Sequence, residues 1–232
     1  MIISFRHRFI FVAIPKTATH ALRVALRPHL GPRDWEQCAL FENKTFPVAA
    51  LAQIGHGHIT CLQVRPFLLR ELWESSFRFC TVRNPYDRFV SYCYFMNREN
   101  QRMQKDPLGT MKQIIEDKQD AEQVLFRPQC EFVIDEEGRL MVNYVSKFEA
   151  LQNHFDDIRQ RLRLPNIQLQ HINVTGWAVR RFRYDLELKE MVQTVYRQDF
   201  ALFDYPLDLP VNARGQIAPQ SEPGREREAG PR

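Results

Sequence analysis

The sequence has no internal repeat and no run approaching the ~20 apolar residues that a membrane-spanning helix needs. Its apolar N-terminal stretch is interrupted by His7 and Arg8 and lacks a small-residue cleavage site, so it is interpreted as a strand and not as a signal peptide. The five cysteines are odd in number and include no C-x-x-C pair. Such usage argues against a disulfide framework and favours a reducing compartment. These absences predict a cytoplasmic protein without a membrane anchor, in contrast to a Golgi-type enzyme.

The excess of positive over negative charge is also small. The 232 residues carry 32 basic and 28 acidic side chains, which gives a formal net charge of +4. This mild excess fits an anionic ligand such as a nucleotide or a phosphate, and no nucleic-acid partner is predicted. The hydrophobic content of 44% and the charged content of 26% are typical of globular proteins. The length suits one large domain, which we place at residues 1–209.

Apolar runs that alternate with helical patterns predict an α/β fold with a mainly parallel central sheet flanked by helices. Buried strands are expected over 8–14 and 77–83, each followed by a proline-containing turn and a helix. The other expectations are helices over 66–74, 86–95 and 148–162, a hairpin of 130–135 with 139–145, a strand over 168–173 and a last helix capped by Asp185. Residues 98–110 look loop-like, and the tail 210–232 has too few apolar residues to order itself.

The turn after the first strand, residues 15–20, has features of a phosphate loop. A helix that begins there would present unpaired N–H groups and a partial positive charge to an anion. Lys16 adds a full charge, and the hydroxyls of Thr17 and Thr19 can donate hydrogen bonds. The G-x-x-x-x-G-K-[ST] signature is absent, and the turn contains no glycine. The alternative is an ordinary strand–helix turn with a solvated lysine and a threonine N-cap.

The second strand ends in a similar constellation. Arg83 stands at its carboxyl end, where ligands of open α/β sheets bind, and Ser91 follows about two helical turns later. An arginine fork with a serine hydroxyl suits a second phosphate, although Arg83 could equally form a strand-end salt bridge. Arg88 is expected to be a helix-surface charge that braces the turn. Two phosphate sites on neighbouring strand ends indicate a nucleotide phosphorylated at two positions.

These motifs resemble those of a known family. IPKTATHAL is similar to the 5′-phosphosulfate loop, and VRNPYDRFVSYCYF to the 3′-phosphate motif, of sulfotransferases that use 3′-phosphoadenosine 5′-phosphosulfate (PAPS). The resemblance is greatest to the branch of carbohydrate 2-O-sulfotransferases and small bacterial sulfotransferases. It continues in the family's order through GHGHIT (55–60), RPQ (127–129), DEEG (135–138), VSKFEAL (145–151), HIN (171–173) and YRQDFALFDY (196–205).

The resemblance implies a P-loop-like three-layer fold and transfer of a sulfuryl group from PAPS to a hydroxyl of a carbohydrate or glycolipid, without a metal. The residues implied at the 5′-phosphosulfate are Lys16, Thr17, Ala18, Thr19 and His20, and those at the 3′-phosphate are Arg83 and Ser91. One departure stands out, because many relatives have Gly followed by Thr or Ser where this chain has Thr19 and His20.

Two histidines are candidates for the base that deprotonates the acceptor. A histidine pKa near 6.5 suits this task, and a similar His-Gly-His supplies the base in the resembling 2-O-sulfotransferases. His58 is the preferred candidate, His56 is the second, and Lys16 would stabilise the leaving oxygen. Alternatively the pair forms half of a zinc site or is structural.

Other functions remain open at the level of sequence. The chain could be a catalytically silent nucleotide-binding protein on the same fold, or a phosphotransferase that uses the Lys16 loop. The cluster of Arg180, Arg181 and Arg183 could cover the nucleotide or be a solvated face.

Overall fold

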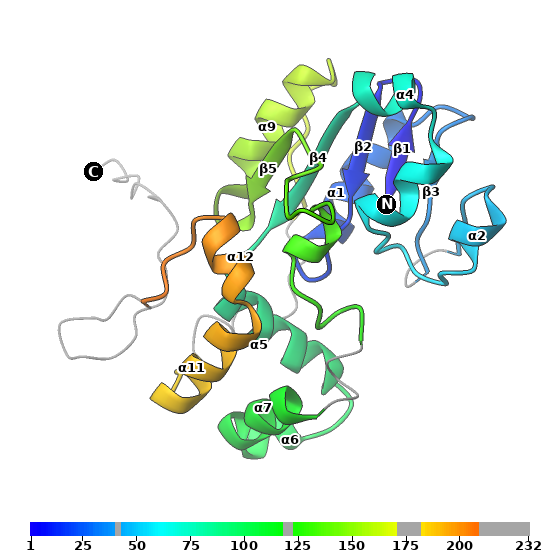
Figure 1. The fold of residues 1–232 in the computed structure, drawn as a ribbon. Coiled ribbons are helices and arrows are strands. Elements are labelled where there is room, and N and C mark those ends of the chain that lie inside the picture. Colours follow the sequence, from blue (N-terminus) through cyan, green and yellow to red (C-terminus); the bar gives the residue numbers. More distant parts are fainter. Residues whose placement is uncertain (40–42, 118–122, 171–181, 209–232) are drawn as a thin grey trace, which may run out of the picture.

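The computed structural model describes residues 1–39, 43–117, 123–170 and 182–208 (Figure 1). Five strands form one sheet in the order β3-β1-β2-β4-β5. The strands are β1 (Ile2–Ser4), β2 (Phe9–Val12), β3 (Trp35–Glu36), β4 (Phe77–Val82) and β5 (Tyr144–Lys147). β2, β4 and β5 are parallel, whereas β1 is antiparallel to both of its neighbours. The sheet is therefore mixed, with a parallel core.

The two faces of the sheet carry separate apolar clusters, because successive side chains of a strand point to opposite faces. On one face Phe9 and Phe11 pack with Leu22 of α1 (Thr19–Leu26) and Phe155 of α9 (Leu151–Arg161). The opposite face is covered by the helices α3 (Cys61–Val64), α4 (Arg70–Ser75), α5 (Pro85–Met96), α11 (Leu186–Val195) and α12 (Arg197–Leu202). Helices flank the sheet on both faces, as expected for the predicted α/β class.

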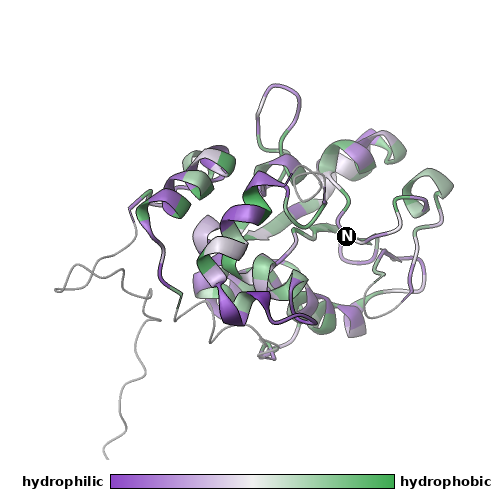
Figure 2. Cartoon of the chain, turned by 90° about the horizontal axis from the view of Figure 1, so that it is seen from below, coloured by the Kyte–Doolittle hydropathy of each residue, from purple (hydrophilic) through white to green (hydrophobic). Residues whose placement is uncertain are grey.

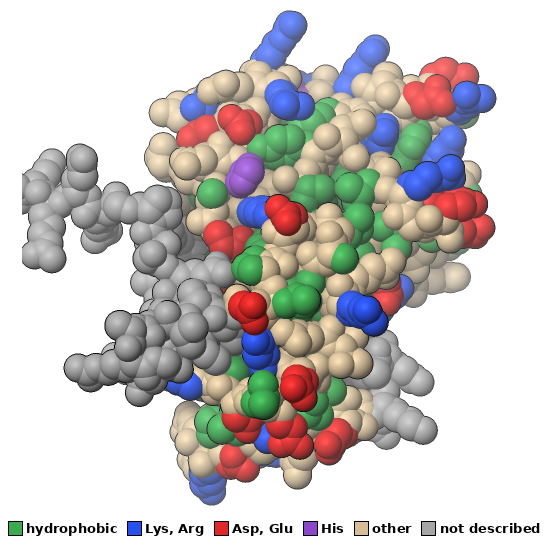
Figure 3. Space-filling model, turned by 60° about the vertical axis from the view of Figure 1, so that its left-hand side comes forward, with side chains coloured by type: hydrophobic (Ala, Val, Ile, Leu, Met, Phe, Trp, Pro, Cys, Tyr) green, Lys and Arg blue, Asp and Glu red, His purple; other side chains and the backbone are tan. Residues whose placement is uncertain are grey.

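The remaining helices lie outside these two layers or extend them. They are α2 (Ala49–Ala52), α6 (Arg102–Lys105) and α7 (Pro107–Glu116), with 3-10 turns at Arg27–His29 (η1), Arg65–Phe67 (η2), Cys130–Phe132 (η3) and Phe148–Ala150 (η4). The helices show alternating hydrophilic and hydrophobic stripes (Figure 2). Figure 3 shows acidic and basic side chains interspersed on one face of the molecule, in keeping with the small net charge.

Several predicted elements are confirmed. β2 and β4 lie within the two predicted strands, and α5, α9 and α11 within or close to the predicted helices. Asp185 caps α11, since its carboxylate accepts a 2.8 Å hydrogen bond from the backbone N–H of Leu188.

Other expectations were wrong or incomplete. The predicted hairpin is replaced by η3, a single bridge between Ile134 and Leu140, and β5, which pairs in parallel with β4. The loop-like segment contains α6 and the start of α7, which is capped by Asp106. The helix over 66–74 is split into η2 and α4, because the backbone of Leu68 between them is extended.

Some expectations fall on residues outside the described ranges. These are the tail 210–232, Arg180, Arg181 and part of the strand candidate 168–173, whose residues 168–170 are not in a strand. All five cysteines are buried, and none of them is in a disulfide. Within the described ranges, no helix combines the length and apolar character that crossing a membrane requires.

Candidate active site

The two predicted phosphate sites lie at one edge of the sheet. β2 pairs in parallel with β4, with Val12 opposite Cys80, and this register continued past the strand brings Pro15 level with Arg83. β5 pairs with β4 in the same direction. The carboxyl ends of three parallel strands therefore meet where open α/β sheets bind ligands.

The turn between β2 and α1 has an unusual backbone. Lys16 and Ala18 have φ values of 66° and 63°, in the left-handed region that costs a non-glycine residue roughly 1–2 kcal/mol. Backbone that enters and leaves this region directs successive N–H groups into a concavity that suits an anion. Strain of this kind is often associated with function.

Two side chains hold the turn in this conformation. The hydroxyl of Thr17, a fully buried residue, donates to the carbonyl of Ile14 over 2.9 Å. Nε of Arg88, which is also fully buried, donates to the carbonyl of Pro15 over 3.0 Å, and its guanidinium also reaches the carbonyls of Leu125 and Arg127. Arg88 therefore braces the loop as the sequence predicts, but it is buried and is not the helix-surface charge that was expected.

The N-terminus of α1 has no side-chain cap. Its N-cap is Ala18, whose side chain has no hydrogen-bond acceptor, so the threonine N-cap considered from the sequence is wrong. Thr19 is the first helical residue and is not among the residues with positive φ. A threonine in place of the family's glycine therefore introduces no left-handed strain.

Lys16 lies among cationic and aromatic groups. Its ammonium is 3.9 Å from the centroid of the Phe95 ring on α5. Burial and, less strongly, the charges of Arg83, Arg88 and Arg98 together lower the pKa of Lys16 to about 8. The edge of the sheet beside Lys16 is therefore electropositive, which favours an anion there.

Arg83 follows β4 and is buried, with only 6% of its surface exposed. Its guanidinium lies 4.2 Å from the centroid of the Phe148 ring. Within the described residues, Nε of Arg83 is the one buried side-chain nitrogen or oxygen without a hydrogen-bond partner. Burial lowers the pKa of Arg83, whereas the carboxylates of Asp87 and Glu149 raise it. Ser91 is also buried, two turns along α5.

Gln129 and Asp199 fix the backbone of Arg83. The side-chain amide of Gln129 accepts from the N–H of Arg83 over 2.8 Å and donates to its carbonyl over 2.9 Å. The carboxylate of Asp199 accepts in turn from the backbone N–H groups of Gln129 and Cys130, each over 2.8 Å. Sequence reasoning assigned no role to these residues. Their position in the RPQ and YRQDFALFDY motifs was the one available signal.

His58 contacts the chain just after β2, at Ala13, which is three residues before Lys16. Its Nδ1 lies 2.6 Å from the carbonyl of Ala13. A carbonyl can only accept, so Nδ1 carries the proton and Nε2 keeps its lone pair. Burial lowers the pKa of His58 to about 3, and the backbone hydrogen bond only partly offsets this. The imidazole is therefore neutral at physiological pH. Its pKa lies well below the value near 6.5 expected from the sequence, so the ring in this environment is a weaker base than expected.

His56 has the opposite tautomer. The backbone N–H of His58 donates to Nδ1 of His56 over 3.2 Å. Nδ1 of His56 therefore bears no proton, and Nε2 is the donor in the neutral ring. The two ring centroids are 6.1 Å apart. The pair thus offers one acceptor and one donor in a small space.

Comparison with protein-family models matches the sulfotransferase family over residues 1–206. The chain belongs to this family. The match includes both strand ends, the His-Gly-His segment, Gln129 and Asp199. Each of these parts of the candidate site therefore lies within the region that matches the family. Comparisons with curated proteins and with solved structures found no significant match.

The sequence also leaves open a zinc site at the two histidines. In the parts of the chain that the structure describes, no group of three or more His, Cys, Asp or Glu side chains is placed to hold a metal ion. His-Gly-His alone would supply two ligands, whereas structural zinc takes four and catalytic zinc three.

Proposed function

We propose that this sulfotransferase moves a sulfuryl group from PAPS to a hydroxyl of a carbohydrate or glycolipid. The observation that supports it most is the unpartnered Nε of buried Arg83, beside a loop whose strained backbone and uncapped helix N-terminus suit a second anion. A buried donor without a partner costs roughly 1–3 kcal/mol, so a ligand that pairs it gains affinity. The acceptor class rests on the resemblance to carbohydrate 2-O-sulfotransferases.

The binding roles follow from the place of each residue. Lys16, Thr17, Ala18, Thr19 and His20 would surround the 5′-phosphosulfate, mainly through backbone N–H groups, because the Thr17 hydroxyl is turned towards Ile14. Arg83 and Ser91 would hold the 3′-phosphate. The Lys16 ammonium would stabilise the negative charge that develops on the leaving oxygen.

The hydrogen bonds of the two histidines favour His58 as the base. Nε2 of His58 has the free lone pair that proton abstraction needs, whereas Nε2 of His56 carries a hydrogen and can donate to a sulfuryl oxygen. In the step, a bond forms between the acceptor oxygen and sulfur as the bond from sulfur to the 5′-phosphate oxygen breaks. The leaving oxygen keeps the electron pair, and the acceptor proton passes to His58.

A ligand panel tests the proposal. Calorimetric titration is expected to show binding of 3′,5′-adenosine bisphosphate about 100-fold tighter than of 5′-AMP, because each charge-assisted phosphate site contributes about 1.5–3 kcal/mol. Labelled sulfate should then move from PAPS to a hydroxyl acceptor without added magnesium. Tight binding without transfer to any hydroxyl would favour a silent binder, and preference for Mg-ATP would favour a phosphotransferase.

The lowered pKa of Lys16 predicts a pH dependence of binding. Lys16 is charged below about pH 8 and neutral above it, and a bound anion favours the charged form. Affinity for 3′,5′-adenosine bisphosphate is therefore expected to fall about tenfold between pH 7.5 and pH 9.5, with proton uptake on binding near pH 8.5. Lys16→Met is the control and should bind weakly without this dependence. A wild-type affinity that stays constant over this range would contradict the assignment.

A further inference from the structure

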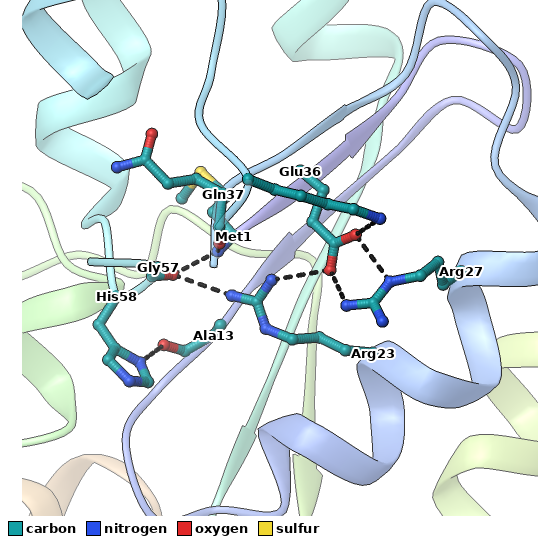
Figure 4. Close-up of polar contacts among 9 residues, drawn as sticks. Met1, Ala13, Arg23, Arg27, Glu36, Gln37, Gly57 and His58 are labelled. Atoms are coloured by element: carbon teal, nitrogen blue, oxygen red, sulfur yellow. Dashed lines mark hydrogen bonds and ion pairs between the residues drawn. The ribbon is translucent and has the colours of Figure 1, made fainter. Parts of the chain in front are cut away.

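A buried arginine of α1 reaches the peptide between the two histidines. Nη2 of Arg23 donates to the carbonyl of Gly57 over 3.1 Å, while Nη1 lies 3.2 Å from Oε1 of Glu36 (Figure 4). Arg23 is only 4% exposed. The guanidinium thus links the sheet edge at β3 to the His-Gly-His segment.

From these contacts we propose that Arg23 is a positioning residue for His58, which it orients through the carbonyl of Gly57. The proposal rests on the proposed role of His58 as base. Arg23 is a buried cation outside the phosphate loop, and neither the binding of the nucleotide nor the base step above uses it.

The peptide that Arg23 holds has little freedom. A Cβ atom on Gly57 would lie 2.4 Å from the carbonyl oxygen of Gln37 and 2.7 Å from Nη2 of Arg23. Only glycine fits between these groups. The side chain of Gln37 also donates to the carbonyl of His56 over 3.0 Å, and the Met1 ammonium donates to the Gly57 carbonyl. Both peptides before His58 are therefore fixed by hydrogen bonds.

The second partner of the Arg23 guanidinium is the carboxylate of Glu36. Burial raises the pKa of Glu36, but Arg27 and, less strongly, Arg23 and Lys44 lower it below its usual value. The carboxylate is therefore ionised at neutral pH. Two nitrogens of Arg27 each lie 2.9 Å from an oxygen of the Glu36 carboxylate. Arg23 contacts the same carboxylate through Nη1, and its Nη2 donates to the carbonyl of Gly57.

The position of Gly57 decides which way the His58 ring faces. The ring contacts Ala13 through Nδ1, and this contact leaves Nε2 as the acceptor. Were the Gly57 peptide to move, the ring could turn and the two tautomers would mix. The titratable or charged groups that act on His58 are Arg23, His56 and the Met1 amino group, whose own pKa burial lowers well below its usual value.

A pair of variants tests this role. Glu36→Gln retains an oxygen that accepts from Arg23 and leaves the contact of Arg23 with Gly57, but the buried guanidinium loses its carboxylate. Arg23→Met/Glu36→Gln removes both buried charges together with the contact to Gly57. The two proteins differ only at Arg23. Thermal unfolding and titration with 3′,5′-adenosine bisphosphate would verify that each is folded and binds.

The readout is the nitrogen NMR spectrum of the His58 ring. In wild type and in Glu36→Gln we expect a neutral ring protonated at Nδ1, with a pKa that stays near 3. In the double variant we expect mixed tautomers, titration at least about one pH unit higher, and a kcat lower by about tenfold or more at unchanged bisphosphate affinity. A His58 spectrum identical in the two variants would overturn the proposal. Full activity of a His58 variant would instead overturn the base assignment, whatever the spectrum shows.

Discussion

Replacement of Arg83 with alanine is expected to weaken binding of 3′,5′-adenosine bisphosphate about 100-fold, because a buried charge-assisted pair with phosphate contributes about 1.5–3 kcal/mol. The guanidinium is already placed before any ligand arrives. Phe148 lies against its face, and Gln129 fixes its backbone on both sides. Little conformational entropy is then lost on binding, so most of the interaction energy appears as affinity.

The effect of Arg83→Ala should be specific to one phosphate. Affinity for 5′-AMP, which lacks the 3′-phosphate, is expected to change less than about threefold, as for a change in distant charge. Arg98→Ala is the matched control: Arg98 is an exposed arginine that acts on Lys16 through its charge, and its removal should have an effect of similar small size. Calorimetry with both ligands decides the matter. Equal losses for 5′-AMP and for the bisphosphate would show that Arg83 does not contact the 3′-phosphate.

The placement of the candidate site was predictable because it depends on local patterns. Strands rich in Phe, Val and Ile end at Pro15 and at Arg83, and parallel strands present their carboxyl ends at one edge. The resemblance then added the identity of the ligand, which the strand ends alone do not specify.

The supports of the site could not be derived from local patterns. The contact of Gln129 with Arg83 spans 46 residues, that of Asp199 with Gln129 spans 70, and that of Arg88 with Pro15 spans 73. The periodicity of a sequence does not predict which distant backbone group will form a hydrogen bond with a buried polar side chain. Buried polar groups must nevertheless be paired, and here the pairings connect the motifs that the resemblance lists separately.

The errors in the fold have similar causes. The run at Ile2–Ser4 is too short to be distinguished from the start of β2, and only its pairing with β2 shows a hairpin turn at 5–8. The segment at Tyr144–Lys147 follows a turn signal, which favoured a hairpin. Its actual partner is β4, 65 residues earlier in the chain, and this parallel pairing extends the buried sheet.

The tautomers of the two histidines lead to the strongest functional prediction. His58→Asn is expected to lower kcat about 10³-fold, within the range of 10²–10⁴ that general bases contribute. The asparagine amide can still donate to the carbonyl of Ala13, so the end of β2 should keep its conformation and bisphosphate affinity should change less than about threefold.

His56→Asn is the matched control for His58→Asn, since it removes a donor and not the base, and its expected loss in kcat is about tenfold. The pH profile separates the roles further. With a His58 pKa near 3, the base stays deprotonated as the pH falls, so wild-type kcat/KM should show no acid limb near pH 6.5 from this residue. Steady-state rates of sulfuryl transfer for both variants would decide between them. A larger loss in His56→Asn than in His58→Asn would reverse the assignment, because the protonated Nε2 of His56 would then have to exchange its tautomer to accept the proton.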